Sequence, residues 1–314
     1  MTTKRVPQET TVAVLMGGWS AERRVSLSSG EGCSHALQRA GFKVVPVDVT
    51  RERIVSILQD LRPNVAFNAL HGKWGEDGCC AAILETLQIP YTHSGVLASS
   101  LAMHKEKSKI VFREAGIPVA ESKLVELEQV AAAHPMTFPY VVKPVAEGSS
   151  VGVHIVTSNA NGPLSIVLEQ RDIFGSHAMV ERFIPGRELT CAVIGDVALG
   201  VVDIVSKSSG WYDYTAKYAP GGSQHILPAD IPNDVYRKCQ QYALMAHKAL
   251  GCRGVSRSDF RYNDTVKDGE LILLEVNTQP GMTGTSLVPE LAAHAGHNFE
   301  DLVTWMVNDA SLDR

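Results

Sequence analysis

The chain has 314 residues, 20% of them charged, and a formal net charge of −5. This charge balance lacks the basic excess of a nucleic-acid-binding protein, so a small-molecule ligand is expected and no nucleic acid. No apolar run approaches the length of a membrane-spanning helix, and residues 1–11 lack the apolar region of a secretory signal. We therefore expect a cytoplasmic protein with no membrane partner. Six cysteines occur without a C-x-x-C pair. Their apolar surroundings favour buried, reduced thiols over zinc or disulfides.

The first third of the chain alternates between strand and helix patterns. Short Val-rich segments predict strands, and apolar residues at helical spacing lie between them. Such alternation is typical of a parallel sheet with helices on both faces, so residues 1–93 are expected to form a doubly wound α/β domain. The predicted strands are residues 11–16, 43–49 and 64–70, and the predicted helices are residues 26–40, 51–61 and 78–87.

The remaining two thirds predict two α+β units. Residues 94–182 begin with a helical stretch at 97–116 and continue with three short strands. Residues 183–314 contain longer strands, and an apolar-poor segment at 208–225 carries three tyrosines and three glycines. A loop of that length in a compact chain is usually functional or disordered. The predicted strands are residues 123–127, 140–145, 151–156, 178–184, 188–195, 197–205, 255–262 and 271–277; residues 232–250 and the C-terminal end predict helices.

Two of these strands carry acids at alternate positions. Glu275 and Asn277 end one strand, and Arg257 and Asp259 lie on the strand before it. Because residues two apart point to the same face, and Asp268-Gly269 predicts a hairpin turn, one face would display all four side chains. Two carboxylates and an amide are oxygen ligands suited to Mg²⁺ that also binds substrate phosphates. A solvated edge with a salt bridge is the simpler reading of one acid; the combined set favours metal and phosphate.

A second pattern combines a strand lysine with a Gly-Ser-Ser turn. Lys143 precedes EGSSVG at residues 147–152, whose backbone N–H groups can cradle phosphate oxygens. The P-loop pattern G-x-x-x-x-G-K-[ST] is absent, and so is the G-x-G-x-x-G dinucleotide fingerprint. A Gly/Ser hairpin alone is most often just a hairpin, but with the lysine and the acids it favours a nucleoside triphosphate.

Two polar residues follow strands of the first domain. Glu22 lies in GGWSAERRVS, where it can bind an amino group or can simply begin the next helix. His71 lies among glycines in ALHGKWGEDG, and a structural role and a ligand role are about equally favoured. Both positions fit ligand binding at the carboxyl ends of parallel strands.

Taken together, these stretches resemble the D-alanine–D-alanine ligases of the ATP-grasp family. The resemblance runs in order through GGWSAERRVSLSSG, ALHGKWGEDG, VVKP, EGSSVG, YDYTAKY, SRSDF, LLEVNTQPGMT and TSLVPE. It implies a fold in which the N-terminal α/β domain is followed by an ATP-grasp pair of α+β domains. It also implies ATP-dependent joining of two D-alanines through a D-alanyl phosphate, for peptidoglycan synthesis. Phosphoryl transfer needs positioning and charge neutralisation more than a protein nucleophile, which agrees with the residues present.

The resemblance also implies roles for individual residues. Two Mg²⁺ ions, with Mn²⁺ as a substitute, would be bound by Asp259, Glu275 and Asn277, and K⁺ activation is left open. ATP would contact Lys105, Lys143, Glu181, Phe183, Ile184, Glu188 and Lys217. The catalytic set would be Glu22, Ser149, Tyr218, Arg257 and the backbone N–H of Gly281; His71, Ser286 and Leu287 would contact D-alanine. The 208–225 segment would be a mobile loop that excludes water, and a homodimer is expected.

Three positions depart from the pattern of this family: Arg24, His104 and Phe183 stand where an acid, an aspartate and a tryptophan are frequent. A D-alanine–D-lactate ligase or another ATP-grasp carboxylate–amine ligase is the near alternative, and Tyr218 with TSLVPE favours the dipeptide product. A noncatalytic nucleotide-binding regulator would be expected to lack Arg257 or a metal carboxylate. A nicotinamide-dependent dehydrogenase would need the absent dinucleotide fingerprint.

Overall fold

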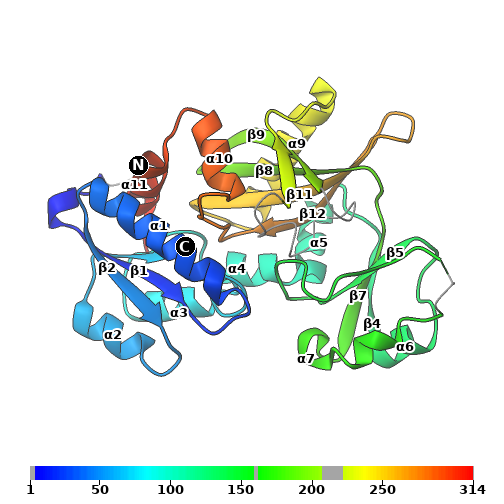
Figure 1. Ribbon diagram of the computed structural model, residues 1–314, viewed down its shortest axis with the longest axis horizontal. Coiled ribbons are helices and arrows are strands. Elements are labelled where there is room, and N and C mark those ends of the chain that lie inside the picture. The colour runs from blue at the N-terminus through cyan, green and yellow to red at the C-terminus, as the bar shows by residue number, and fades with distance from the viewer. Residues whose placement is uncertain (1–3, 159–161, 207–221, 314) are drawn as a thin grey trace.

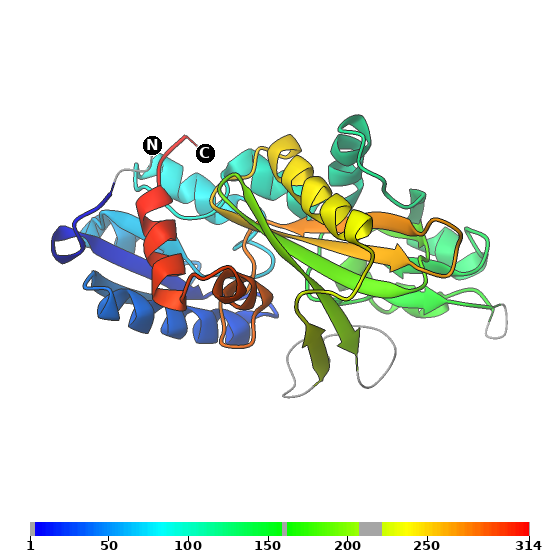
Figure 2. The ribbon, with the colours of Figure 1, turned by 90° about the horizontal axis from the view of Figure 1, so that it is seen from above.

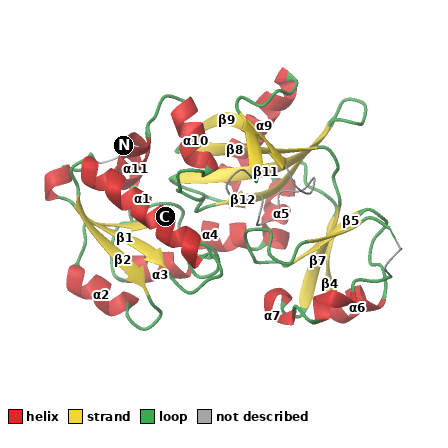
Figure 3. Cartoon of the chain, viewed as in Figure 1, coloured by secondary structure: helices red, strands yellow, loops and turns green. Residues whose placement is uncertain are grey.

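The computed structural model describes residues 4–158, 162–206 and 222–313. Three sheets with their helices form three units, arranged around the middle of the molecule (Figure 1, Figure 3). None of the helices in these ranges is long and apolar enough to cross a bilayer. The six cysteines are free thiols, and five of them are buried, as expected.

The N-terminal unit is built on a three-stranded parallel sheet of order β2-β1-β3. Alternate residues of β1 point to opposite faces: Val12 and Val14 pack toward α1, while Ala13 and Leu15 pack toward α2 and α3. Helices on both faces of a parallel sheet were predicted and are confirmed. The strands are β1 (Thr11–Gly17), β2 (Lys43–Val49) and β3 (Val65–Asn68), after a short 3-10 helix η1 (Pro7–Glu9); the helices are α1 (Arg23–Arg39), α2 (Ile54–Leu61) and α3 (Cys79–Thr86).

The predicted single helix at 97–116 is two helices, α4 (Val96–Met103) and α5 (Lys105–Glu114). The break falls at His104, whose Nδ1 accepts a hydrogen bond from the backbone N–H of Lys107 at 3.3 Å. This side chain therefore acts as the N-cap of α5, a role that aspartate commonly takes. The interruption turns α5 so that Lys105 begins it next to the central sheet.

The central unit has a four-stranded antiparallel sheet of order β4-β7-β5-β6. Strands β5 and β6 are shorter than predicted because residues 144–153 form the turn-rich segment that contains EGSSVG, whereas β4 has the predicted length, shifted by one residue. The elements are β4 (Ser122–Glu126), α6 (Leu127–Ala132), β5 (Tyr140–Lys143), β6 (His154–Val156), the 3-10 helix η2 (Ser165–Leu168), α7 (Arg171–Phe174) and β7 (His177–Arg182).

The C-terminal unit has a five-stranded antiparallel sheet of order β10-β9-β8-β11-β12. Helix α9 packs on it, as Figure 2 shows. Strand β10 falls inside the predicted loop at 208–225, because residues 223–226 pair with β9; residues 207–221 lie outside the described ranges. The elements are β8 (Arg187–Ile194), β9 (Val197–Ser206), β10 (Ser223–Ile226), α9 (Asn233–Ala249), β11 (Val255–Asn263) and β12 (Glu270–Asn277).

Strands β11 and β12 form the predicted hairpin. Arg257 pairs with Asn277 and Asp259 pairs with Glu275, so the four polar residues share one face. The register then shifts, because Phe260 pairs with Leu273 and leaves Leu274 as an extra residue in β12. This β-bulge places Leu274 and Glu275, which are adjacent in sequence, on the same side of the sheet.

The last two helices, α10 (Leu287–His294) and α11 (Phe299–Asp309), return to the N-terminal unit. Val288 and Val303 belong to the same apolar cluster as Val14 of β1. Arg5 donates hydrogen bonds to the carbonyl oxygens of Val307 and Ala310. Helix α11 thus packs beside α1 on the N-terminal unit, while α10 contacts both α11 and strands β8 and β9 of the C-terminal sheet. The predicted boundaries at 93 and 182 stay predictions.

Candidate active site

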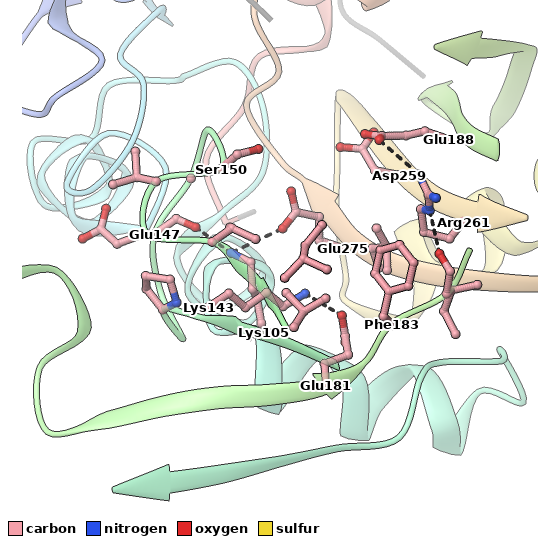
Figure 4. A pocket seen from close by; sticks show the side chains of 18 of the residues that line it. Lys105, Lys143, Glu147, Ser150, Glu181, Phe183, Glu188, Asp259, Arg261 and Glu275 are labelled. Atoms are coloured by element: carbon pink, nitrogen blue, oxygen red, sulfur yellow. Dashed lines mark hydrogen bonds and ion pairs between the residues drawn. The ribbon is translucent and has the colours of Figure 1, made fainter. Parts of the chain in front are cut away.

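Two adjoining pockets lie where the three units meet. The first lies between the central sheet and β11–β12 (Figure 4), and the second lies between the N-terminal unit and the end of β12. Gly148 and Glu275 line both pockets, so the two spaces meet at these residues. Every predicted site residue in the described ranges lines one or both. The first pocket receives Lys105, Lys143, Glu181, Phe183, Ile184, Glu188, Asp259 and Glu275; the second receives Glu22, His71, Ser149, Arg257, Glu275, Asn277, Gly281, Ser286 and Leu287.

Asp259 is the most highly bonded acid of the hairpin. The Arg257 guanidinium donates to both its oxygens, at 2.8 and 2.7 Å, and Thr190 donates at 2.7 Å. The Nδ2 of Asn277 donates to the same carboxylate at 3.0 Å. Three of the four residues of the predicted shared face, Arg257, Asp259 and Asn277, therefore form one hydrogen-bonded network, and Glu275 pairs with Lys105 beside it.

This donor set fits a hard divalent cation in chemical type. No group of three His, Cys, Asp or Glu suited to a metal occurs in the described ranges, and the third predicted ligand beside Asp259 and Glu275 is an amide, Asn277. One or two carboxylates, with waters and substrate phosphates, are what Mg²⁺ ordinarily uses. A cation at Asp259 would replace one of its present donors, such as the Nδ2 of Asn277, whose side chain also carries an oxygen ligand.

Lys105 connects the hairpin to the turn-rich segment. Its Nζ lies 3.3 Å from Glu275 and donates to the carbonyl oxygen of Glu147 at 2.6 Å (Figure 4). Burial raises the pKa of Glu147 above its ordinary value, and Lys73 and Lys105 offset this in part. The first residue of α5 thus presents a nearly buried cation to the place where the pockets meet.

Glu181, the residue before the last in β7, is a buried carboxylate with two lysine partners. Its Oε1 accepts a hydrogen bond from Lys143 at 2.8 Å, and its Oε2 accepts one from Lys109. Burial favours the neutral acid, but the two lysines, Lys143 foremost, outweigh it and hold the pKa of Glu181 below its ordinary value. The carboxylate therefore stays charged at neutral pH.

An apolar and aromatic wall completes the first pocket. Phe183 and Ile184 follow Glu181, and the Arg261 guanidinium lies 5.8 Å from the centre of the Phe183 ring. Arg261 also donates to the carbonyl oxygen of Ile184 at 3.0 Å and approaches Glu188 at 3.5 Å. A flat, apolar ligand group edged by polar atoms would fit between these side chains.

Glu22 and Ser149 are brought together in the second pocket although 127 positions separate them; Ser149 donates a hydrogen bond to Glu22. The carboxylate is nearly buried. Gly72 makes room for it, since it has a φ of +72° and a Cβ there would lie 2.6 Å from Glu22 Oε2. The turn-rich segment and the N-terminal unit thus meet through this contact.

His71 is held on both sides of its ring. Its Nε2 lies 2.9 Å from the hydroxyl of Ser29, and its Nδ1 lies 3.3 Å from Glu76. Such paired contacts fix the ring plane and the tautomer. His71 is therefore a rigid wall of the second pocket.

The segment after β12 forms the far side of the second pocket. The Ser286 hydroxyl accepts a hydrogen bond from the backbone N–H of Thr283 at 2.9 Å. A Cβ on Gly281 would lie 2.8 Å from the Ser286 hydroxyl, so a glycine is required for this close approach. Leu287 begins α10 immediately afterwards.

Lys217 and Tyr218, and most of the predicted mobile loop, lie outside the described residues. Sequence reasoning missed several residues of the site, among them Lys109, Glu76 and Arg261, which contact predicted residues, and Gln279, which lines the second pocket. Lys109 could have been found, since it lies four residues after Lys105 on the same helix and so on the same face. Glu76 lies only five residues after His71 in ALHGKWGEDG, whereas Arg261 and Gln279 reach the site through contacts distant in sequence.

The comparisons with known proteins agree with this geometry. Residues 111–308 match the family model described as D-ala D-ala ligase C-terminus. The chain is 59% identical over 305 residues to a D-alanine–D-alanine ligase of Parvibaculum lavamentivorans, covering 96% of this chain and 98% of that protein. It is also 59% identical over 304 residues to the enzyme of that name from Methylocella silvestris, with 96% and 99% covered.

Solved structures give the same result. A D-alanine–D-alanine ligase from Bacillus anthracis, complexed with ATP, superposes with a TM-score of 0.79 at 29% identity, covering 96% of this chain and 97% of that one. The VanG D-Ala:D-Ser ligase from Enterococcus faecalis gives a TM-score of 0.77 at 28% identity, with 96% and 99% covered.

The fold and its two pockets define an ATP-grasp ligase. Within that class, the chain belongs to the D-alanine–D-alanine ligase family.

Proposed function

We propose that this protein joins two D-alanines into D-alanyl-D-alanine at the expense of ATP, the step that supplies the dipeptide for peptidoglycan. The observation that carries the proposal is the pair of pockets that meet at Gly148 and Glu275. One pocket has the lysines and apolar wall that a nucleotide needs, and the other has the acid and backbone donors that an amino acid needs. Relatives that cover nearly the whole chain carry this activity in their names.

ATP would occupy the first pocket. The adenine would lie against Phe183 and Ile184, next to Glu181, and Glu188 would contact the ribose. Lys105 and Lys143 would contact the phosphates, with Lys217 as a further cation. Positioning and charge neutralisation of this kind are what phosphoryl transfer requires from a protein.

The two D-alanines would occupy the second pocket. Glu22, held by Ser149, would orient the ammonium group of the first D-alanine, with His71 beside it. The first carboxylate would take the γ-phosphoryl group of ATP and release ADP, which gives a D-alanyl phosphate. The amine of the second D-alanine would then attack its carbonyl carbon, and inorganic phosphate would leave as the amine loses a proton. Arg257 and the backbone N–H of Gly281 would stabilise the oxyanion. Ser286 and Leu287 would hold the second carboxylate.

The metal assignment follows from the donor set described above. Asp259, Glu275 and Asn277 would hold two Mg²⁺, or Mn²⁺, and the ions would supply charge neutralisation to the ATP phosphates. Activation by K⁺ remains an open part of the proposal. Asp259 would at the same time keep the Arg257 guanidinium directed along the hairpin.

We further propose that the enzyme is a cytoplasmic homodimer and that residues 208–225 close over the site, with Tyr218 completing a hydrogen-bond triad with Glu22 and Ser149. Closure would keep water from the acyl phosphate. The three units would then correspond to domains at residues 1–93, 94–182 and 183–314.

The test is ADP and phosphate release from Mg-ATP by the purified protein, with the organic product identified by mass. The arms are D-alanine alone, L-alanine alone, and D-alanine with D-lactate or D-serine. Release that requires D-alanine and yields D-alanyl-D-alanine is expected. No release in any arm, from protein that remains folded, would refute the proposed reaction; release that yields only the mixed product would reassign the second substrate.

A further inference from the structure

Lys109 is a fully buried lysine to which the proposed function gives no role. Its side chain has no exposed surface. Its Nζ donates to the backbone carbonyl of Ala120 at 3.0 Å and to Glu181. A lysine in such a place is costly to bury unless a charged partner compensates, so the ion pair with Glu181 is the reason it can be there.

Glu181 separates Lys109 from the first pocket. Its other oxygen is bonded to Lys143, and both Glu181 and Lys143 line that pocket (Figure 4). One carboxylate is thus shared between a lysine that faces the ligand and a lysine behind it. Two ammonium groups and one carboxylate leave this cluster with a net charge of +1.

Lys143 lines the first pocket and Lys109 does not, so the two lysines would act on a bound nucleotide in different ways. Lys143 has three N–H donors and can reach a ligand in the pocket while it contacts Glu181. If Lys109 were absent, Lys143 would be the sole cation in this cluster, whose net charge would fall to zero. The attraction for phosphate groups would then be weaker, because the buried carboxylate would take up the charge of Lys143.

We propose that Lys109 is a positioning residue for nucleotide binding: it neutralises Glu181 from behind, so that the positive charge of Lys143 remains available to the phosphates in the first pocket. This rests on the proposed function only in that the pocket must bind a nucleotide. Helix α5 would then contribute two lysines to nucleotide binding, because Lys105 and Lys109 lie one turn apart on it.

The protonation of Lys109 agrees with this role at neutral pH. Burial lowers the pKa of Lys109 to about 8, with Glu181 opposing the shift and Lys143 adding to it. The binding experiment is therefore made at pH 7, where the ammonium form predominates.

The test measures the ratio of ADP affinity to adenosine affinity by calorimetry, because adenosine lacks the phosphates. In Lys109→Met this ratio is expected to fall about tenfold, with adenosine affinity nearly unchanged, since one unit of charge near the phosphates is lost. In Lys109→Met/Glu181→Gln the ratio is expected to return toward the wild-type value, because the net charge is again +1. Adenosine affinity falls in that double variant if Glu181 contacts the adenine.

Lys107→Met is the matched control: Lys107 lies on the same helix, is more than half exposed, and pairs with Glu106. Its ratio should equal that of the wild type. If Lys109→Met does not fold, Lys109→Gln takes its place, because its neutral amide can still donate hydrogen bonds to Glu181 and to the Ala120 carbonyl. The ratio must fall there as well.

An unchanged ratio in folded Lys109→Met, or an equal loss of adenosine and ADP affinity, would overturn the inference, because Lys109 would then act on the fold or on the adenine side alone. Wild-type protein that binds neither ligand would refute nucleotide binding itself, and with it the proposed function. The two failures are therefore distinguishable.

Discussion

At the scale of single residues, the two acids of the β11–β12 hairpin, Asp259 and Glu275, are held in place by neighbouring side chains. Asp259 accepts hydrogen bonds from Arg257, Thr190 and Asn277, while Glu275 lies against Lys105. Carboxylates supported in this way keep a fixed orientation, which a metal ligand requires. Of the two, Glu275 lies where both pockets meet, so its charge acts on both ligands.

Glu275→Gln is expected to lower kcat by more than about a hundredfold while the fold is kept, because an amide replaces the carboxylate proposed to bind the metal at nearly the same volume. ADP release at saturating Mg-ATP and D-alanine measures the effect, and circular dichroism checks the fold. Asp268→Asn is the control, since it makes the same change at the hairpin turn, where a φ of +68° suits asparagine. Near-normal turnover of Glu275→Gln would remove the metal-ligand assignment.

A second residue-scale prediction concerns acid stability. His247 is buried, lies 2.7 Å from the Ser256 hydroxyl, and burial lowers its pKa to about 4 from 6.5. The unfolded chain therefore binds a proton between pH 6.5 and 4 that the folded state does not, so this stability is present above pH 6.5 and is lost as the pH falls toward 4.

Urea unfolding of the wild type and of His247→Gln at pH 7 and pH 5 checks this. The wild type should lose about 2 kcal/mol more than the variant between these pH values, since the other titrating groups are common to both proteins. Equal losses in the two proteins would contradict a neutral, buried His247.

At the scale of elements, the bulge in β12 decides which side chains reach the first pocket. Strict alternation places Leu273 and Glu275 on one face and Leu274 on the other. The register shift instead leaves Leu273 in the core under α9 and turns both Leu274 and Glu275 toward the pocket. The strand therefore presents an apolar and a charged side chain in succession to one ligand.

Two neighbouring substitutions test this arrangement. Leu274→Ala should raise the KM for ATP about fivefold with little loss of stability, because it removes a half-buried pocket contact. Leu273→Ala should instead cost about 2–5 kcal/mol of unfolding free energy with the KM nearly unchanged, because it leaves a core cavity. Steady-state kinetics and urea unfolding of both variants measure the effects; the reverse assignment would show that the register is regular.

The elements that could be predicted from the sequence are those whose local pattern decides them. Strand β2 has the predicted bounds of 43–49, and the β11–β12 pairing follows from alternation and the Asp-Gly turn. The break at His104, the bulge at Leu274 and the strand at 223–226 could not be predicted. Each depends on tertiary pairing or on a single capping hydrogen bond, which leaves little trace in hydrophobic periodicity.

The same division holds for the site. Residues in recognisable motifs, such as Lys143, were predicted, and the described ones line the pockets. Lys109 and Gln279 were not predicted, because the contacts that hold them at the site are made with residues 72 and 211 positions away. A contact of that range is set by how the units pack together.

At the scale of the whole molecule, a buried amide pair joins the first unit to the last. Asn68, at the end of β3, donates from Nδ2 to Gln279 Oε1 at 2.6 Å, and Gln279 donates to the carbonyl oxygen of Leu70. Gln279 also lines the second pocket, two residues before Gly281. The pair therefore fixes the distance between the two walls of that pocket.

Gln279→Leu is expected to raise the KM for D-alanine and lower kcat, with the KM for ATP nearly unchanged, because the first pocket is untouched. Stability should fall by about 1–3 kcal/mol, since the Leu70 carbonyl and the Asn68 amide lose their partner. Gln240→Leu is the control: it loses a comparable bond, to the Leu199 carbonyl at 2.7 Å, away from both pockets. If both variants raised the KM for D-alanine equally, the effect would come from lower overall stability and not from the position of Gln279 in the second pocket.

The return of α11 to the N-terminal unit has a consequence for the order in which the protein assembles during synthesis. Val14 and Phe67 emerge from the ribosome early, yet Val303 of α11, which lies in the same apolar cluster beside α1, is added near residue 300. Part of the apolar face of the N-terminal sheet therefore stays uncovered until almost the entire described chain has been translated. A nascent chain with an apolar face exposed for that interval is prone to aggregation.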